Sequence, residues 1–209
     1  MHAKTLIRTF AILVFMISSV GVASAQKNEI GLLLGGLRTG NKAFQLPVRG
    51  QLEIGAGLSF QANYAHRFVD FGVASLYVEV PFLATPSTGV RSADPFVPRN
   101  YASLFITPGL KLKILPHSRI APFGAVGGGY ARLTASKSLI NNQPNNAGTL
   151  GANHGALDFG GGVDVRVFRF LALRGEVRDF VTGKPNLNVQ VLQGAQHNVV
   201  GSGGIVLGF

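Results

Sequence analysis

Hydrophobic and polar residues alternate along several stretches of the chain, most clearly from Gln51 to Tyr64. In this segment, "QLEIGAGLSFQANY", the even positions are apolar or aromatic and the odd positions are polar or glycine. Successive side chains of a β-strand point to opposite faces of a sheet, whereas a helix would mix the two sets. The pattern therefore predicts a strand with one apolar face and one polar face.

The same period of two recurs in segments 72–82, 104–114, 156–167, 171–181 and 198–209, and more weakly in 121–133. In 121–133 we place Phe123 and Leu133 on the apolar face and Arg132 on the other. The first segment, "NEIGLLLGGLRT", is apolar with ambiguous faces, and a bulge at Gly35–Gly36 would switch its register. These eight candidate strands have about the 9–11 residues that a tilted membrane-crossing strand needs.

The charged residues within these strands fall opposite the apolar faces. Leaving aside the ambiguous first strand, six bases and five acids share this position: Glu53, Glu79, Lys111, Lys113, Arg132, Asp158, Asp164, Arg166, Arg174, Glu176 and Arg178. An Arg or Lys that faces lipid at mid-bilayer costs about 2–4 kcal/mol, so the apolar faces are expected to point outward into lipid. The near-balance of signs predicts a lumen filled by paired ions instead of a filter of one charge sign.

The connections between these strands alternate in length. Those at 39–50, 84–101, 134–155 and 183–196 are long, and those at 66–70, 115–119 and 168–170 are short. Long loops on one side and tight turns on the periplasmic side are typical of outer-membrane barrels. The pattern predicts an all-β fold, an eight-stranded antiparallel up-and-down transmembrane β-barrel. The alternative is a soluble β-sandwich or lipocalin-like barrel with its apolar faces inward, and the sequence alone does not say which face lies inside.

The N-terminal segment has the pattern of a secretory signal peptide. Lys4 and Arg8 precede an apolar run and then the small residues Ala23–Ser24–Ala25. We expect a cleaved signal peptide at 1–25, with cleavage between Ala25 and Gln26, and one barrel domain at 26–209. A membrane anchor, the alternative, would need about 20 apolar residues, and this run is shorter. No cysteine follows, which excludes a lipoprotein and a disulfide-stabilised domain.

Net charge adds little about partners. Residues 26–209 hold 17 basic and 9 acidic residues, a net charge of +8. The bases are scattered singly, whereas a nucleic-acid-binding protein carries them in a cluster. Because the chain is also expected to be exported, we exclude nucleic acid as a partner.

The C-terminal residues "SGGIVLGF" resemble the assembly signal of bacterial outer-membrane β-barrels. That signal has a polar residue, a glycine, a hydrophobic residue and a terminal aromatic residue at fixed spacing, here Ser202, Gly204, Leu207 and Phe209. The resemblance implies handling by periplasmic chaperones and the barrel-assembly machinery. The alternative is an ordinary last strand that ends in phenylalanine.

Two longer stretches, "IAPFGAVGGGYARL" and "LDFGGGVDVRVFRFLALRGEVRDFVTG", look like strands five to seven of the small eight-stranded OmpA/OmpX-like family. The resemblance implies that charged residues of these strands lie in the lumen: Asp164, Arg166, Arg174, Glu176 and Arg178. The chain departs from the family in lacking tryptophan. Its aromatic girdle is therefore expected on Phe and Tyr, such as Phe60, Tyr64, Phe82, Phe159 and Phe209. Because no peptidoglycan-binding domain follows the barrel, we expect no role in tethering the cell wall.

We expect no enzymatic activity, no cofactor and no metal site. Near the outer rim, His154 and Asp158 are the one histidine–carboxylate pair that could act in catalysis. No enzyme motif surrounds His154 or His197. The glycine runs 127–129 and 160–162 lie within strands, where missing side chains let a small barrel curve and give a large neighbour room. No helix follows them, so they do not form a phosphate-binding loop.

The predicted protein is a closed, monomeric, integral outer-membrane barrel whose loops act in envelope integrity, adhesion or surface recognition. The loops contain one acid, Asp94, and six bases: Lys42, Arg49, Arg91, Arg99, Lys137 and Lys184. We call these residues the rim, and we expect its positive charge to contact lipopolysaccharide phosphates. Two alternatives remain. One is a narrow porin-like channel, and the other is an outer-membrane lipid-modifying enzyme.

Overall fold

The computed structural model describes residues 27–40, 42–45, 49–146, 148–183, 188 and 194–209. The predicted signal peptide, with Ala25 and Gln26, and the loop residue Lys184 lie outside them. No helix within the described ranges is long and apolar enough to cross a membrane.

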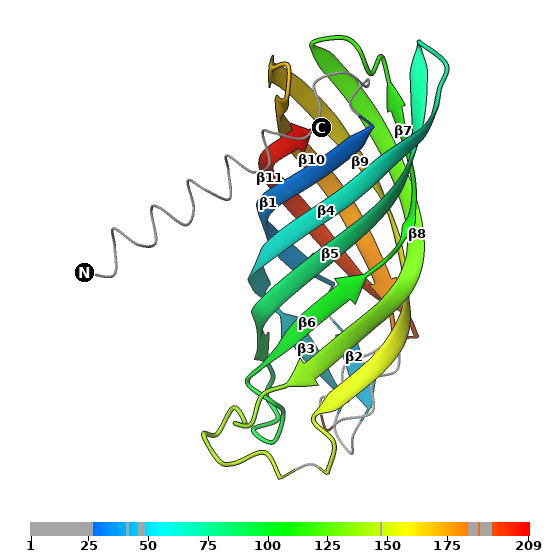
Figure 1. Cartoon of the computed structure of the whole chain (residues 1–209). Helices are drawn as coiled ribbons and strands as arrows, with labels where there is room; N and C mark the ends of the chain where they lie inside the picture. The colour runs from blue at the N-terminus through cyan, green and yellow to red at the C-terminus, as the bar shows by residue number, and fades with distance from the viewer. Residues whose placement is uncertain (1–26, 41, 46–48, 147, 184–187, 189–193) are drawn as a thin grey trace, which may run out of the picture.

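The strands form a closed antiparallel ring with eight wall positions, occupied by β1, β4, β5, β6 with β7, β8, β9, β10 and β11 (Figure 1). β6 and β7 share one position because each pairs with both β5 and β8. β2 and β3 form a hairpin, and β3 extends the wall by pairing with the end of β5. This arrangement confirms the predicted eight-stranded up-and-down barrel. The strands are β1 (Asn28–Thr39), β2 (Lys42–Gln45), β3 (Arg49–Ile54), β4 (Ala56–Asp70), β5 (Ala74–Arg91), β6 (Asn100–Ile106), β7 (Gly109–Ile114), β8 (Ile120–Ala135), β9 (Gly151–Phe168), β10 (Leu171–Thr182) and β11 (Gln196–Gly208).

The barrel closes where the first strand pairs with the last. Asn28 and Phe209 exchange two backbone hydrogen bonds of 3.0 Å at one end of the β1–β11 pair. β1 keeps a single register with both β11 and β4 through Gly35 and Gly36. The bulge considered at these glycines is therefore absent, and the odd-numbered residues of β1 face inward along the whole strand.

The connections are short at one end of the barrel and long at the other. The turns 71–73, 115–119 and 169–170 lie at the top of Figure 1, and the β2–β3 hairpin and the described loop residues 92–99 and 136–146 lie at the bottom. We call these the turn end and the loop end. The alternation of connection lengths in the sequence thus corresponds to two structurally different ends.

The outer wall carries a band of apolar side chains. Leu34 and Leu58 lie on neighbouring strands and leave 59% and 61% of their surfaces uncovered. Large apolar residues are also exposed on the other strands of the ring: Val78, Leu110, Val126, Leu157, Val177 and Ile205. The apolar faces predicted within 56–64, 74–82, 104–114, 157–167 and 171–177 all point outward. Such a continuous band would drive association in water but is stable in hydrocarbon.

The interior at the loop end contains a cluster of buried apolar side chains. Phe105 and Phe180 lie at its centre, with ring centroids 5.0 Å apart. We call the surrounding buried cluster the apolar layer: Leu37, Ile54, Leu83, Val90, Val97, Tyr101, Phe105, Ala131, Leu133, Ala156, Phe180 and Val200. Half of the interior is therefore packed like the core of a water-soluble protein.

The closing seam depends on close backbone contact at Gly204. A Cβ atom built there would lie 2.7 Å from the Cα atom of Leu33 on the neighbouring strand, whereas one at Gly201 would meet nothing within 4 Å. We expect Gly204→Ala to lower the free energy of unfolding by about 1–3 kcal/mol. Gly201→Ala, on the same strand, serves as the matched control and should leave it nearly unchanged. The free energy of unfolding of each variant is measured by denaturant titration of the refolded barrel, with the folded fraction read from the mobility of unboiled protein on a gel. Equal stability of the two variants would contradict this role of Gly204.

Candidate functional site

Charged side chains fill the half of the interior nearest the turn end. The strands β1, β5, β7, β9 and β10 direct them inward because inward positions recur at every second residue of a strand. We call this cluster the ionic layer: Glu29, Glu79, Lys111, Lys113, Asp158, Asp164, Arg174, Glu176 and Arg178. The structure thus brings together eight of the eleven charged residues predicted to face the lumen.

The part of the ionic layer closest to the turns is built around Asp164. Arg174 contacts both of its carboxylate oxygens, through Nε at 2.7 Å and Nη2 at 2.8 Å. Lys113 Nζ lies 2.7 Å from the same carboxylate and also pairs with Glu29. Lys111 Nζ reaches Glu29 at 2.9 Å. Each cation in this part is shared between strands that are distant in sequence, so the contacts cross the barrel interior.

The deeper part of the ionic layer is organised by Arg178. Its guanidinium group lies 2.5 Å from Glu79, 2.8 Å from Asp158 and 3.2 Å from Glu176. Gln61 on β4 donates from Nε2 to Glu176 at 2.5 Å. Arg178 leaves 2% of its surface exposed and Lys111 leaves none, so these charges have almost no contact with solvent. Such burial is tolerated only where each ion has partners of opposite sign.

Four cations and five carboxylates make up this layer, so neither sign dominates. Aromatic rings fill space beside the cations: Arg174 lies 4.5 Å from the ring centroid of Phe123, and Lys111 lies 4.9 Å from that of Tyr77. A small pocket of about 60 Å³ opens at the turn end beside Glu29, Lys113 and Asp164. The arrangement suits a filled interior and not a pathway selective for ions of one sign.

Two glycines of the run 160–162 make room for large side chains. A Cβ atom at Gly160 would lie 2.7 Å from the Cα atom of Arg178, and one at Gly162 would lie 2.7 Å from the Cβ atom of Glu176. These pairs are directly opposite in the β9–β10 register. The glycines therefore allow the charged side chains of β10 to cross the interior.

The prediction for Arg132 was wrong. Its side chain is exposed on the outer wall, whereas Phe123 and Leu133 of the same strand face inward and are buried. The reason is that inward residues of β8 pack into the apolar layer and against the ionic layer, so hydrophobicity does not mark the outer face of this strand.

Glu53 and Arg166 also lie outside the ionic layer, contrary to the prediction, and each is exposed at one end of the barrel. Gly55 interrupts the chain between β3 and β4, so the alternation of β4 does not continue to Glu53. Arg166 has the predicted parity but lies at the turn end, where it donates to the carbonyl oxygens of Pro116 at 2.5 Å and His117 at 3.0 Å.

Glu29 is a member of the ionic layer that the sequence analysis missed. It lies on β1, whose faces could not be distinguished because Leu33 and Leu37 are apolar yet face inward. The charged residues gave no consistent signal, because Glu29 has an odd position of the strand and Arg38 has an even one.

His154 and Asp158, the candidate catalytic pair, do not form a dyad. Asp158 is buried against Arg178, and His154 precedes it by four residues of an extended strand, a separation of about 13 Å. The structure instead pairs His197 Nδ1 with Asp179 Oδ2 at 2.6 Å on neighbouring strands. The backbone N–H of Asn198 also donates to Asp179, at 3.1 Å.

A second small cluster lies at the turn end around Asp70. Its carboxylate contacts Arg67 at 2.8 Å and His117 at 3.2 Å. The backbone N–H of Gly72 donates to it at 2.9 Å, and this hydrogen bond is the main cause that holds the pKa of Asp70 below its ordinary value. Asp70 thereby links the first turn to the second.

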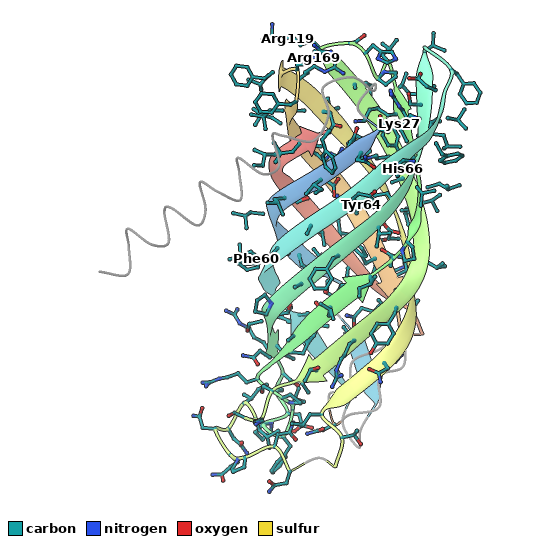
Figure 2. The ribbon with its side chains drawn as sticks, in the orientation of Figure 1. Lys27, Phe60, Tyr64, His66, Arg119 and Arg169 are labelled. Atoms are coloured by element: carbon teal, nitrogen blue, oxygen red, sulfur yellow. The ribbon has the colours of Figure 1, made fainter. Side chains whose placement is uncertain are left out.

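The residues of the expected assembly signal lie on β11 and at its end. Ser202 and Gly204 face inward, whereas Leu207 and Phe209 lie on the outer face. The aromatic residues expected in a girdle, Phe60, Tyr64, Phe82, Phe159 and Phe209, are exposed on the outer wall, and Figure 2 labels Phe60 and Tyr64 there. The recognition role of the β11 residues remains a prediction.

Two solved structures share this architecture. Neisserial surface protein A superposes with a TM-score of 0.55 at 14% sequence identity, covering 88% of this chain and 98% of that chain. The outer membrane protein OprG from Pseudomonas aeruginosa gives a TM-score of 0.55 at 11% identity, covering 88% and 96%. The fold is that of the small outer-membrane β-barrels. No protein-family model and no curated protein matches the sequence.

The contacts of Arg178 predict a large effect on stability. Arg178→Met would leave Glu79, Asp158 and Glu176 buried without their shared cation, and we expect the free energy of unfolding to fall by about 3–5 kcal/mol. Arg99→Met, at an exposed position in a loop, is the control and should change it by less than about 0.5 kcal/mol. Urea titration in detergent or lipid vesicles provides the measurement. If the two variants were equally stable, Arg178 would not organise the ionic layer as described.

Proposed function

We propose that the chain is an integral outer-membrane protein with a closed interior, which anchors its loops for envelope integrity, adhesion or surface recognition. The observation that carries this proposal is the combination of an outward apolar band with an interior filled by two different layers. The band suits a bilayer, and the filled interior leaves the loop end as the part available for contacts with other molecules. The predicted signal peptide supports export, and the likeness to small outer-membrane barrels supports the location.

The two interior layers argue against the channel alternative. A solute would have to pass the ion pairs around Arg178 and then the packed rings of Phe105 and Phe180. An eight-stranded barrel is only wide enough for its own side chains. Opening such a path would separate buried ion pairs in one layer and unpack aromatic residues in the next.

The loop end presents a basic and internally connected surface. Arg91, Arg99 and Lys137 are exposed there. Backbone hydrogen bonds join the two loops that carry them, including Arg99 N–H to Ser138 O at 3.1 Å. Lys42 and Arg49 lie on the β2–β3 hairpin of the same end. This positive charge supports the proposal that the rim contacts phosphate groups of lipopolysaccharide. In this proposal the barrel is a monomer, and the barrel-assembly machinery recognises the β11 residues during its insertion.

Neutralising the rim should weaken lipopolysaccharide binding. For the triple variant Arg91→Gln/Arg99→Gln/Lys137→Gln we expect a loss of roughly fivefold in affinity per residue, and a weaker dependence on salt. Anisotropy of fluorescent lipopolysaccharide, titrated with barrels in nanodiscs, measures the affinity. Asp94→Asn removes an acid from the rim and should not weaken binding. An unchanged affinity of the triple variant would reject the rim as the contact site.

Because the interior is closed, we expect the unaltered protein to show no ion conductance in planar bilayers. Because the two layers lie in series, neither Arg178→Ala alone nor Phe105→Ala/Phe180→Ala alone should open a pathway. The combined triple variant is the informative comparison, since it removes central side chains from both layers and should raise the conductance. Unboiled gel mobility would verify that each variant is folded. Steady single-channel steps from the unaltered protein would support the narrow channel in place of this proposal.

A further inference from the structure

The turn end carries exposed aromatic residues that no part of the described chain covers. Phe168 and Phe170 flank the β9–β10 turn, with 59% and 58% of their surfaces exposed. Their rings are stacked, with centroids 6.1 Å apart and planes at 14°. Arg169, between them in sequence, is also exposed. Exposed aromatic rings beside a guanidinium group are suited to the boundary between hydrocarbon and headgroups.

A second arginine is held next to this turn by Arg166. The backbone N–H of Arg166 donates to Arg119 O at 2.8 Å, and its guanidinium group binds the carbonyl oxygens of Pro116 and His117. These bonds fix the β7–β8 turn against the end of β9. Figure 2 labels Arg119 and Arg169 at the turn end, on these neighbouring turns.

The exposed cationic side chains at this end outnumber the exposed carboxylate side chains. Lys27, Arg119 and Arg169 are exposed. Among the described residues of the three turns and their flanking strand ends, Asp70 is the one exposed carboxylate side chain, and it is already engaged by Arg67 and His117. Glu29 and Asp164 belong to the ionic layer and are paired there. An anion that approaches the two turns therefore meets unsatisfied guanidinium groups.

We propose that Arg119 and Arg169, together with Phe168 and Phe170, form a binding site for an anionic phospholipid of the leaflet at the turn end. The two guanidinium groups would bind the phosphate of the headgroup, since arginine matches phosphate oxygens with paired donors. The phenylalanine pair would lie among the first acyl carbons. This inference rests on the proposed membrane location, and it assigns the turn end a lipid ligand distinct from that proposed for the rim.

A lipid fits the site better than a dissolved anion. Inorganic phosphate would contact the arginines but would make no use of the stacked rings. A phospholipid offers phosphate and hydrocarbon within one molecule. The net negative charge of phosphatidylglycerol should favour it over zwitterionic phosphatidylcholine, by about fivefold for each arginine that contacts it.

The test measures lipid preference at the turn end alone. The chain has no cysteine, so Val73→Cys places a single fluorophore on the first turn, at a position that is 69% exposed. The labelled full-length mature barrel is placed in phosphatidylcholine vesicles containing either brominated phosphatidylglycerol or brominated phosphatidylcholine at equal mole fraction. Quenching by bromine reports which lipid lies near the label. We expect stronger quenching by phosphatidylglycerol, with a relative association constant of about five or more.

Paired variants identify the residues responsible. Arg119→Gln/Arg169→Gln should bring the relative association constant close to one. Arg132→Gln, an exposed arginine near the loop end, should leave it unchanged. Added inorganic phosphate, at matched ionic strength, should compete poorly. The proposal is overturned by equal quenching in the unaltered barrel, by a preference that survives the double variant, or by a preference that phosphate abolishes. Failure of the proposed membrane location would appear differently, as a labelled protein that is soluble without detergent and is quenched by neither lipid.

Discussion

The small circumference of the barrel is the constraint on which the rest of the structure depends. Eight strands enclose a space that side chains alone can fill, so an inward ion has little water to solvate it. Each buried cation must therefore reach a carboxylate on another strand. Arg174 and Arg178 do so, with Asp164 and Glu79 among their partners. Inward glycines on β9 follow from the same restriction, because long side chains of β10 need the space in front of them.

The interior combines two solutions to this packing problem. Near the turns, ion pairs define which strands face each other, and a displacement of β10 by one residue would turn Arg178 outward and leave its partners unpaired. Near the loops, hydrophobic packing around Phe105 and Phe180 fills most of the space. Hydrogen bonds also link the buried side chains of Thr39, Tyr101, Gln196 and Asn198 there. The ionic half therefore contributes most to the choice of register, and the apolar half contributes transfer free energy. Both halves separate the loop end from the turn end.

The sequence was sufficient for the architecture and for most of the ionic layer. Segments such as 56–64 and 171–177 have polar or charged inward residues, so alternation identified their outer faces correctly. It failed where inward residues are apolar: Leu133 made the outward Arg132 appear to face the lumen, and Leu37 hid the orientation of β1 and of Glu29. The orientation of Glu53 was also predicted wrongly, because the strand breaks at Gly55 while the alternation of the sequence continues through it. The errors on β1 and β8 share one cause, since hydrophobicity distinguishes inside from outside only where the core is polar.

The hydrogen bonds between Asn28 and Phe209 join two residues that are separated by almost the whole folded chain. Neither edge strand has its second partner until this junction forms, and unpaired backbone groups are costly in hydrocarbon. Ring closure therefore waits for β11, the last of the eight wall strands. Shortening β11 by its final few residues would remove the pairs at the turn end, such as Glu29 with Gly208, and would leave that end of β1 as an unpaired edge.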